Sequence, residues 1–297
     1  MKIIKNILNI ILSFLLIFVI AIIIVSNVLE TKILDRNYVD SKLDETEFYL
    51  QVSREVKSGF ENYIYQSGLP VETFDNLFTD EMIKKDVSSI MDCLYNGTEI
   101  SLSDEVVRKN LDIKVQNYIN SQGQELNTQG KENIKKFEDL IVKEYRENVN
   151  TSTTLYKTGN QVLNNVKQVN EMIGNKPIII LVIIIVSIII INNKNLLNAI
   201  NFISISFLSL GILLKLTVNL IFKSIEFDNL VLLTTSLTNL IVSIAKEILY
   251  NLSDKGTLFI VCSLIGIIVC AILDNINNED NKNVVKAPKR RNQKRNI

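Results

Sequence analysis

Four long apolar runs dominate the hydrophobic pattern of this chain. The first is centred on residues 7–25, and the second, 178–191, is almost pure Ile and Val. The third covers 196–222 with a single charge, Lys215, and the fourth covers 257–273. An α-helix rises about 1.5 Å per residue, so that about 20 apolar residues cross the core of a bilayer. We therefore predict an all-α chain with membrane helices at 1–29, 177–193, 196–222 and 257–273.

The first run predicts an uncleaved signal anchor. No charge interrupts the 24 residues between Lys5 and Glu30. A cleaved signal peptide has an apolar core of only about 7–15 residues before small residues at its cleavage site. The core here is longer, and no Ala-x-Ala pattern follows it. For 178–191 the alternative is a buried strand of a soluble domain, which is disfavoured because the third run begins a few residues later.

Basic residues near both ends of the chain predict its orientation in the plasma membrane. Lys2 and Lys5 precede the first span, and a basic tail at 275–297 follows the last one. Lys and Arg favour the cytoplasmic side, so both ends belong there, and this requires an even number of spans. Residues 30–176 and 223–256 then lie outside the cytoplasm. The basic residues of the tail are Lys282, Lys286, Lys289, Arg290, Arg291, Lys294 and Arg295.

The outer region, 30–176, predicts a helical bundle between the anchor and the later spans. It holds 25 acidic and 18 basic residues, a net charge of −7, which fits a translocated domain. Turn signals are few and apolar positions recur at helical spacing, which disfavours a β-sandwich. Helices are expected at about 36–66, 78–94 and 103–121, the last capped by Ser103, and from 128 nearly unbroken to 173, with weak points at 150–154 and Gly159.

Residues 230–252 predict an amphipathic helix. Leu and Ile side chains line one face, while Thr, Ser, Asn and Lys246 lie mainly on the other. Such a helix is expected to lie in the outer membrane interface. A re-entrant or fifth spanning helix is the alternative, but a fifth span would place the basic tail outside.

Polar residues form a stripe along the third span. On a helical wheel, Asn201, Ser204, Gly211, Lys215 and Asn219 fall within about 80° of one another. A charge at membrane depth is energetically costly and tends to face protein or water. This face of the helix can therefore line a transport pathway or hold a buried ion pair. The partners considered for Lys215 are Glu226, Asp228, Glu247 and Asp274. The alternatives are that Lys215 snorkels to the interface and that the small polar residues are helix-packing contacts.

Composition excludes several classes of function. The chain has no His, which removes His-based catalysis and His-ligated zinc, and its 32 basic and 32 acidic residues argue against a nucleic-acid partner. Three Cys do not make a disulfide framework. Phosphate-loop, dinucleotide, nucleophile-elbow and metal-ligand motifs are missing from the sequence, so no catalytic residue, cofactor or metal is expected.

One segment resembles a known group of proteins. Tyr49 to Asn96 contains the turn Ser67-Gly68-Leu69-Pro70, the pair Phe74/Phe78, Asp86 and Tyr95-Asn96-Gly97. These features are similar to an uncharacterised group of multi-pass membrane proteins from low-GC Gram-positive bacteria, as are the bias toward Ile, Asn and Lys and the scarcity of Arg. The resemblance implies a bacterial membrane architecture and no site residues, since the group has no assigned activity.

The leading functional hypothesis is a non-enzymatic membrane protein. Its outer bundle would act as a sensor, scaffold or accessory subunit whose partners are the bilayer and another membrane or envelope protein. The alternative is a small transporter, channel or permease subunit that uses the polar face around Lys215. The oligomeric state is left open.

Overall fold

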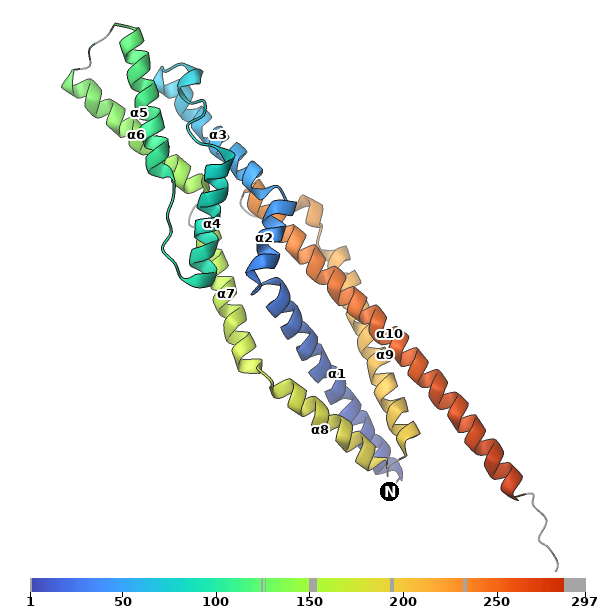
Figure 1. Cartoon of the computed structure of the whole chain (residues 1–297). Coiled ribbons are helices and arrows are strands. Elements are labelled where there is room, and N and C mark those ends of the chain that lie inside the picture. The colour runs from blue at the N-terminus through green and yellow to red at the C-terminus, as the bar shows by residue number, and fades with distance from the viewer. Residues whose placement is uncertain are drawn as a thin grey trace, which may run out of the picture. The chain divides into compact units, whose positions relative to one another are not determined.

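The structure is a computed structural model of the chain (Figure 1) and describes residues 2–123, 125, 127–149, 154–192, 195–231 and 234–285. Helices make up 87% of the chain and the described residues contain no strand, which confirms the all-α prediction. The chain forms two compact units. We call Asn27–Met172 with Glu226–Ile248 the bundle unit, and Met1–Ser26, Ile173–Ile225 and Leu249–Ile297 the apolar unit.

Four helical stretches are long and apolar enough to cross a membrane, as the sequence predicts. They are Ile3–Lys32, Tyr156–Ile191, Leu196–Asn229 and Thr235–Ile276. The helices that supply them are α1 (Lys2–Lys32), α7 (Thr154–Ile173) with α8 (Lys176–Ile191), α9 (Leu196–Ser224) and α10 (Thr235–Val285). The expected loop at Lys194 and the tail from residue 286 onward lie outside the described residues.

In the apolar unit, an amide pair joins α1 to the end of α8. Asn9 and Asn192 are both buried, and each donates its side-chain N–H to the other's carbonyl oxygen, at 3.3 and 3.2 Å. Asn192 also donates to the backbone oxygen of Ile188 at 2.8 Å. Polar groups in an apolar environment need such partners, so this pair favours one register of the two helices.

Small residues bring α9 and α10 close together in the same unit. A Cβ added at Gly211 would lie 2.6 Å from the backbone oxygen of Gly256, and one added at Gly256 would lie 3.0 Å from that of Gly211. A Cβ at Gly266 would collide with the Ser204 hydroxyl. Close backbone approach through small residues is a common packing mode of membrane helices.

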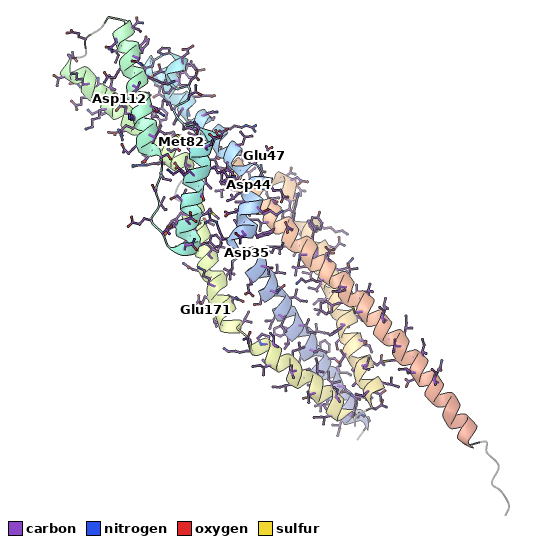
Figure 2. The ribbon with its side chains drawn as sticks, in the orientation of Figure 1. Asp35, Asp44, Glu47, Met82, Asp112 and Glu171 are labelled. Atoms are coloured by element: carbon purple, nitrogen blue, oxygen red, sulfur yellow. The ribbon has the colours of Figure 1, made fainter. Side chains whose placement is uncertain are left out.

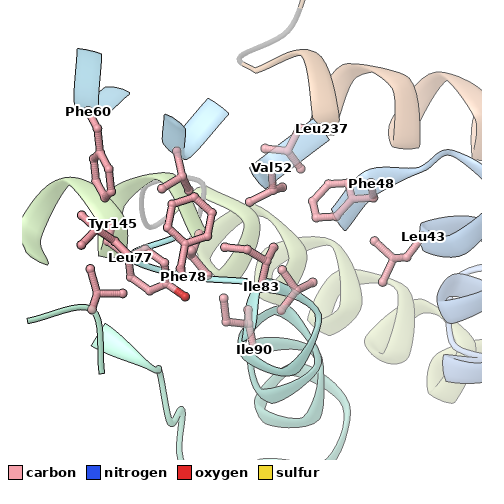
Figure 3. Close-up of a cluster of buried hydrophobic side chains, with 14 of the residues drawn as sticks. Leu43, Phe48, Val52, Phe60, Leu77, Phe78, Ile83, Ile90, Tyr145 and Leu237 are labelled. Atoms are coloured by element: carbon pink, nitrogen blue, oxygen red, sulfur yellow. The ribbon is translucent and has the colours of Figure 1, made fainter. Parts of the chain in front are cut away.

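The bundle unit contains the helices of the expected outer domain. They are α2 (Arg36–Glu45), α3 (Phe48–Ser67), α4 (Asp80–Asn96), α5 (Asp104–Ser121) and α6 (Thr128–Val149), followed by α7, with short 3-10 turns at Val71–Thr73 and Phe227–Asn229. Phe48, Ile83 and Tyr145 are fully buried, and Phe60 and Phe78 meet edge to face with ring centroids 5.9 Å apart (Figure 3). Leu237 of α10 belongs to the same core.

The predicted helix 36–66 is broken at Thr46 and Glu47. Glu47 has a left-handed backbone, with φ 51°, and separates α2 from α3 (Figure 2). The buried side chains Leu43 and Phe48 are five positions apart, which on one continuous helix would turn them about 140° away from each other. The break lets both enter the core. Of the predicted weak point at 150–154, residues 150–153 lie outside the described residues, and Thr154 begins α7, which also contains Gly159.

The fourth span and the segment before it form one helix, which differs from the predicted separate interfacial helix at 230–252. α10 runs 51 residues without interruption. The apolar face expected to rest on the membrane surface instead buries Leu237 and Leu240 in the core of the bundle unit. The reason is that no Pro or strong turn signal lies between Leu252 and Thr257, and Gly256 is used for the contact with α9.

A buried carboxylate connects α4, α5 and α6. Asp86 is fully buried and accepts three hydrogen bonds, from the backbone N–H and hydroxyl of Ser103 at 2.8 and 2.6 Å and from the Tyr145 hydroxyl at 2.9 Å. Ser103 was expected to cap α5, but its side chain makes no cap bond. Its hydroxyl binds Asp86 instead, because a buried carboxylate without hydrogen-bond donors is costly.

The close approach of α9 and α10 leads to a first prediction. Gly211→Leu should destabilise the full-length protein in detergent by about 2–4 kcal/mol, because a side chain at this position meets backbone atoms that have little room to move. Thermal unfolding followed by circular dichroism measures the change. Thr217→Leu, at an exposed position on the same helix, should leave the transition within about 0.5 kcal/mol. Equal effects of the two variants would contradict the tight contact.

Candidate functional site

The structure divides the predicted polar stripe of α9 between two environments. Ser204 and Gly211 are buried at the contact with α10, near Gly266 and Gly256. Asn201, Lys215 and Asn219 are exposed in this chain. The five residues therefore do not line one continuous surface. The buried pair corresponds to the helix-packing interpretation of the stripe, and the exposed three face lipid, water or another protein.

Three of the four carboxylates considered as partners for Lys215 have other contacts, and the fourth, Asp274, is exposed. Glu247 binds two lysines of the bundle unit, Asp228 binds Lys246 at 2.7 Å, and Glu226 accepts a hydrogen bond from Asn229 at 2.8 Å. Among the described residues, Lys215 itself has no ion pair within 4.0 Å, and its side-chain stem lies beside Gly256. The part of the chain that the structure describes therefore offers Lys215 no buried countercharge.

A cluster of charges in the bundle unit joins the end of α1, helix α2 and helix α10. One carboxylate oxygen of Glu247 lies 2.6 Å from Lys32 Nζ and the other lies 2.5 Å from Lys42 Nζ. Lys42 also binds Glu45 at 2.5 Å, and the Lys32 ammonium lies 4.1 Å from the centre of the Tyr38 ring. The side chains of Lys32 and Lys42 are only 19% and 9% exposed. Water therefore stabilises these two charges poorly, and the carboxylate of Glu247 compensates for it.

A second set of polar contacts holds the first turn of α10 against α3. Glu55 accepts hydrogen bonds from the backbone N–H and the hydroxyl of Ser236 at 2.9 and 2.8 Å. Asn239 donates to Gln51 at 2.9 Å. Because a carboxylate favours the N-terminus of a helix, Glu55 acts as a cap supplied from a distant part of the chain. These contacts position the start of α10 within the bundle unit.

Next to the charge cluster lies a cavity of about 470 Å³, entirely within the bundle unit. This volume falls within the roughly 300–1,000 Å³ range of small-molecule sites. Five helices contribute side chains to it, and nearly all of them are apolar. The lining residues are Lys32, Ile33, Val39, Met91, Leu94, Tyr95, Thr158, Gly159, Val162, Leu163, Leu237, Leu240, Ile241, Ile244, Ala245 and Ile248.

Two small residues line the cavity among larger apolar side chains, Gly159 on α7 and Ala245 on α10. A Cβ at Gly159 would lie 3.1 Å from a methyl of Leu94, so this glycine lets Leu94 approach α7 closely. Sequence reasoning did not identify this site. Its one local signal is a Gly and an Ala inside otherwise large apolar patterns, and Gly159 was interpreted there as a weak point of the helix.

A second cleft of about 490 Å³ has a different chemistry. It lies between α5 and α6, and both acidic and basic side chains line it. Among them are Arg108, Asp112 and Glu138 (Asp112 is labelled in Figure 2). Glu138 is 7% exposed, and its Oε1 has no hydrogen-bond partner among the described residues. Burial raises the pKa of this carboxyl and the charge of Asp112 adds to the rise, while Arg108 opposes it.

Comparison of the chain with protein-family models, with curated proteins and with solved structures found no match. The resemblance to low-GC Gram-positive membrane proteins therefore stays a prediction. Within the described ranges, no three His, Cys, Asp or Glu side chains are grouped as metal ligands. Chemically, the apolar cavity beside the Glu247 cluster is suited to binding an apolar group, and it is the site that we consider further.

The charge cluster leads to a second prediction. Glu247→Gln should destabilise the full-length protein by about 1–3 kcal/mol, because Lys32 and Lys42 keep their charges and lose their shared partner. Thermal unfolding in detergent at neutral pH measures the loss. Adding Lys42→Met should restore part of it. Asp254→Asn, at an exposed position of α10, is the control and should change little. If the double variant loses as much free energy of unfolding as its two single variants lose together, the coupling is contradicted.

The buried carboxyl of Glu138 leads to a third prediction, on pH. A raised pKa means that the folded state disfavours the ionised form, so at pH 7 Glu138 lowers the free energy of unfolding. Glu138→Gln should therefore raise it by about 1 kcal/mol at pH 7. The difference from wild type should shrink as the pH falls and the wild-type carboxyl becomes protonated. Melting curves across that range test this, with the exposed Glu132→Gln as control; a difference that grows toward low pH would reverse the assigned sign.

Proposed function

We propose that this chain is a multi-pass plasma-membrane protein whose outer helical bundle binds a ligand or partner, in the role of a sensor, scaffold or accessory subunit without enzymatic activity. The observation that carries the proposal is the composition of the bundle unit. It contains the long segment between the first and second predicted spans and also Glu226–Ile248, which lies between the predicted spans 196–222 and 257–273.

The shared packing of these two segments fits the four-span arrangement. If each apolar helix crosses the membrane once, the first and third connections lie on the same side. The two connections bury a common core that includes Leu237 and Leu240, and they share the Glu55–Ser236 and Glu247–Lys42 contacts. An arrangement with five spans would separate the start of α10 from the remainder of the bundle.

The outer location of the bundle follows from the distribution of basic residues. By the positive-inside rule, Lys2, Lys5 and the basic tail favour a cytoplasmic location for both ends, with the first helix as a signal anchor. The tail from residue 286 onward lies outside the described residues. The net charge of −7 on residues 30–176 agrees with this orientation.

A binding role is favoured over transport through the α9 stripe. A pathway needs a continuous polar face, whereas Ser204 and Gly211 are used in the contact with α10. The bundle unit, in contrast, contains an apolar cavity of ligand size. Transport around the exposed Lys215 is therefore the second choice, and it would require a partner that covers this residue.

Labelling of single cysteines tests the proposed topology. In a chain whose three Cys are replaced by Ser, Glu99→Cys places a thiol on the exposed surface of the bundle unit, and Asn292→Cys places one in the tail. In intact cells, a membrane-impermeant maleimide should label position 99 and leave position 292 unlabelled until the cells are opened. Labelling of position 292 alone would contradict the outer location. Cross-linking through position 99 in the same cells then tests whether the bundle has a protein partner.

A further inference from the structure

The apolar cavity of the bundle unit has almost no free polar group to offer a ligand. The Lys32 ammonium is bound to Glu247 at 2.6 Å, and the Tyr95 hydroxyl donates to the backbone oxygen of Ile33 at 2.8 Å. The remaining lining is aliphatic apart from Thr158. A polar ligand would lose its hydration here without gaining hydrogen bonds, so its binding is unfavourable. An apolar ligand gains from every contact with the lining.

The cavity has a volume of about 470 Å³, which suits a small apolar ligand. Val162 and Ile241 line the cavity and are 42% and 40% exposed, so the cavity opens to its surroundings at this rim. A slender flexible chain can enter by this route.

The position of the lining residues along their helices indicates where that chain comes from. Lys32 ends α1, seven residues after the apolar centre 7–25, and Ile248 lies nine residues before the span that begins at Thr257. At about 1.5 Å per residue, these distances are about 10 and 14 Å along continuous helices. Each headgroup layer of a bilayer is only about 5–8 Å deep, so an acyl chain has to leave the hydrocarbon core and cross this layer to enter the cavity.

We propose that this cavity binds a single acyl chain, taken from a membrane phospholipid or from a free fatty acid. The proposal deepens the ligand-binding function proposed above and rests on it for the nearness of the bilayer. The headgroup stays outside the cavity, because the cationic groups near the rim are already neutralised by Glu247.

Photolabelling of the full-length protein in vesicles tests the proposal. The vesicles contain phosphatidylethanolamine and phosphatidylglycerol, and the probe is phosphatidylglycerol with a diazirine in the middle of one chain. Mass spectrometry should find label on α4, α7 and residues 237–248, in addition to α8, which serves as the internal standard. The same lipid with its diazirine in the headgroup should not label the cavity residues. A parallel experiment with a diazirine fatty acid identifies the source of the chain.

Two variants fill the cavity from different helices. Ala245→Phe adds bulk at its centre, and Val162→Phe does so at its exposed rim, where folding is less affected. Each should lower cavity labelling relative to α8 at least about fivefold, because overpacking opposes binding. Ala271→Phe makes the same change at an exposed position of α10 and should leave the ratio unchanged. Melting curves confirm that each variant is folded.

The outcomes separate this proposal from the one on function. Labelling of the cavity by the phospholipid or by the fatty acid, with loss in folded Val162→Phe, supports acyl-chain binding whatever the topology experiment shows. Absence of cavity label from both probes, or unchanged labelling in both folded cavity variants, overturns it. If position 99 is outside the cell and no label enters the cavity, the acyl-chain proposal fails while the proposed outer bundle stands.

Discussion

The pairing of Glu247 with Lys32 and Lys42 is the interaction on which the bundle unit depends. α10 is one helix of 51 residues that must bury Leu237 and Leu240 in a bundle and then, from Thr257, present apolar side chains all round. Glu247 lies between these two parts of α10 and binds Lys32, the last residue of α1, and Lys42 of α2. Because the two lysines are poorly exposed, this pairing favours one register of α10 against α1 and α2. The same register determines which side chains of α10 line the cavity.

Small residues have two separate roles in the chain. Gly211 and Gly256 remove side chains where two helices must approach closely, so the helices gain contact. Gly159 likewise allows a close approach, by the side chain of Leu94, while Ala245 contributes a small side chain to the lining of the cavity. Small residues therefore form a tight helix contact in one unit and border a ligand-sized cavity in the other.

Several elements were predictable, and the errors share one cause. The four apolar stretches and the helices α4, α5 and α6 were expected near their observed positions, because length and helical periodicity are local properties. The expected helix 36–66 missed the break at Glu47, and 230–252 was separated from the fourth span. Ser103 does occupy the N-cap position of α5, but its side chain binds Asp86. In each case a buried contact with a distant element outweighed a local preference.

The sequence by itself determined that this is an all-helical chain with four membrane-length apolar helices and a polar helical region between the first two. Those properties follow from the length of apolar runs and from the helical spacing of apolar residues, both of which lie within single helices. Only the tertiary structure decided that α10 joins the bundle, that the α9 stripe is divided, and that an apolar cavity lies beside Glu247. The physical reason is distance along the chain: Glu247 is 215 residues from Lys32, and Ser236 is 181 residues from Glu55. Contacts at such separations depend on how whole helices pack, and no local pattern records them.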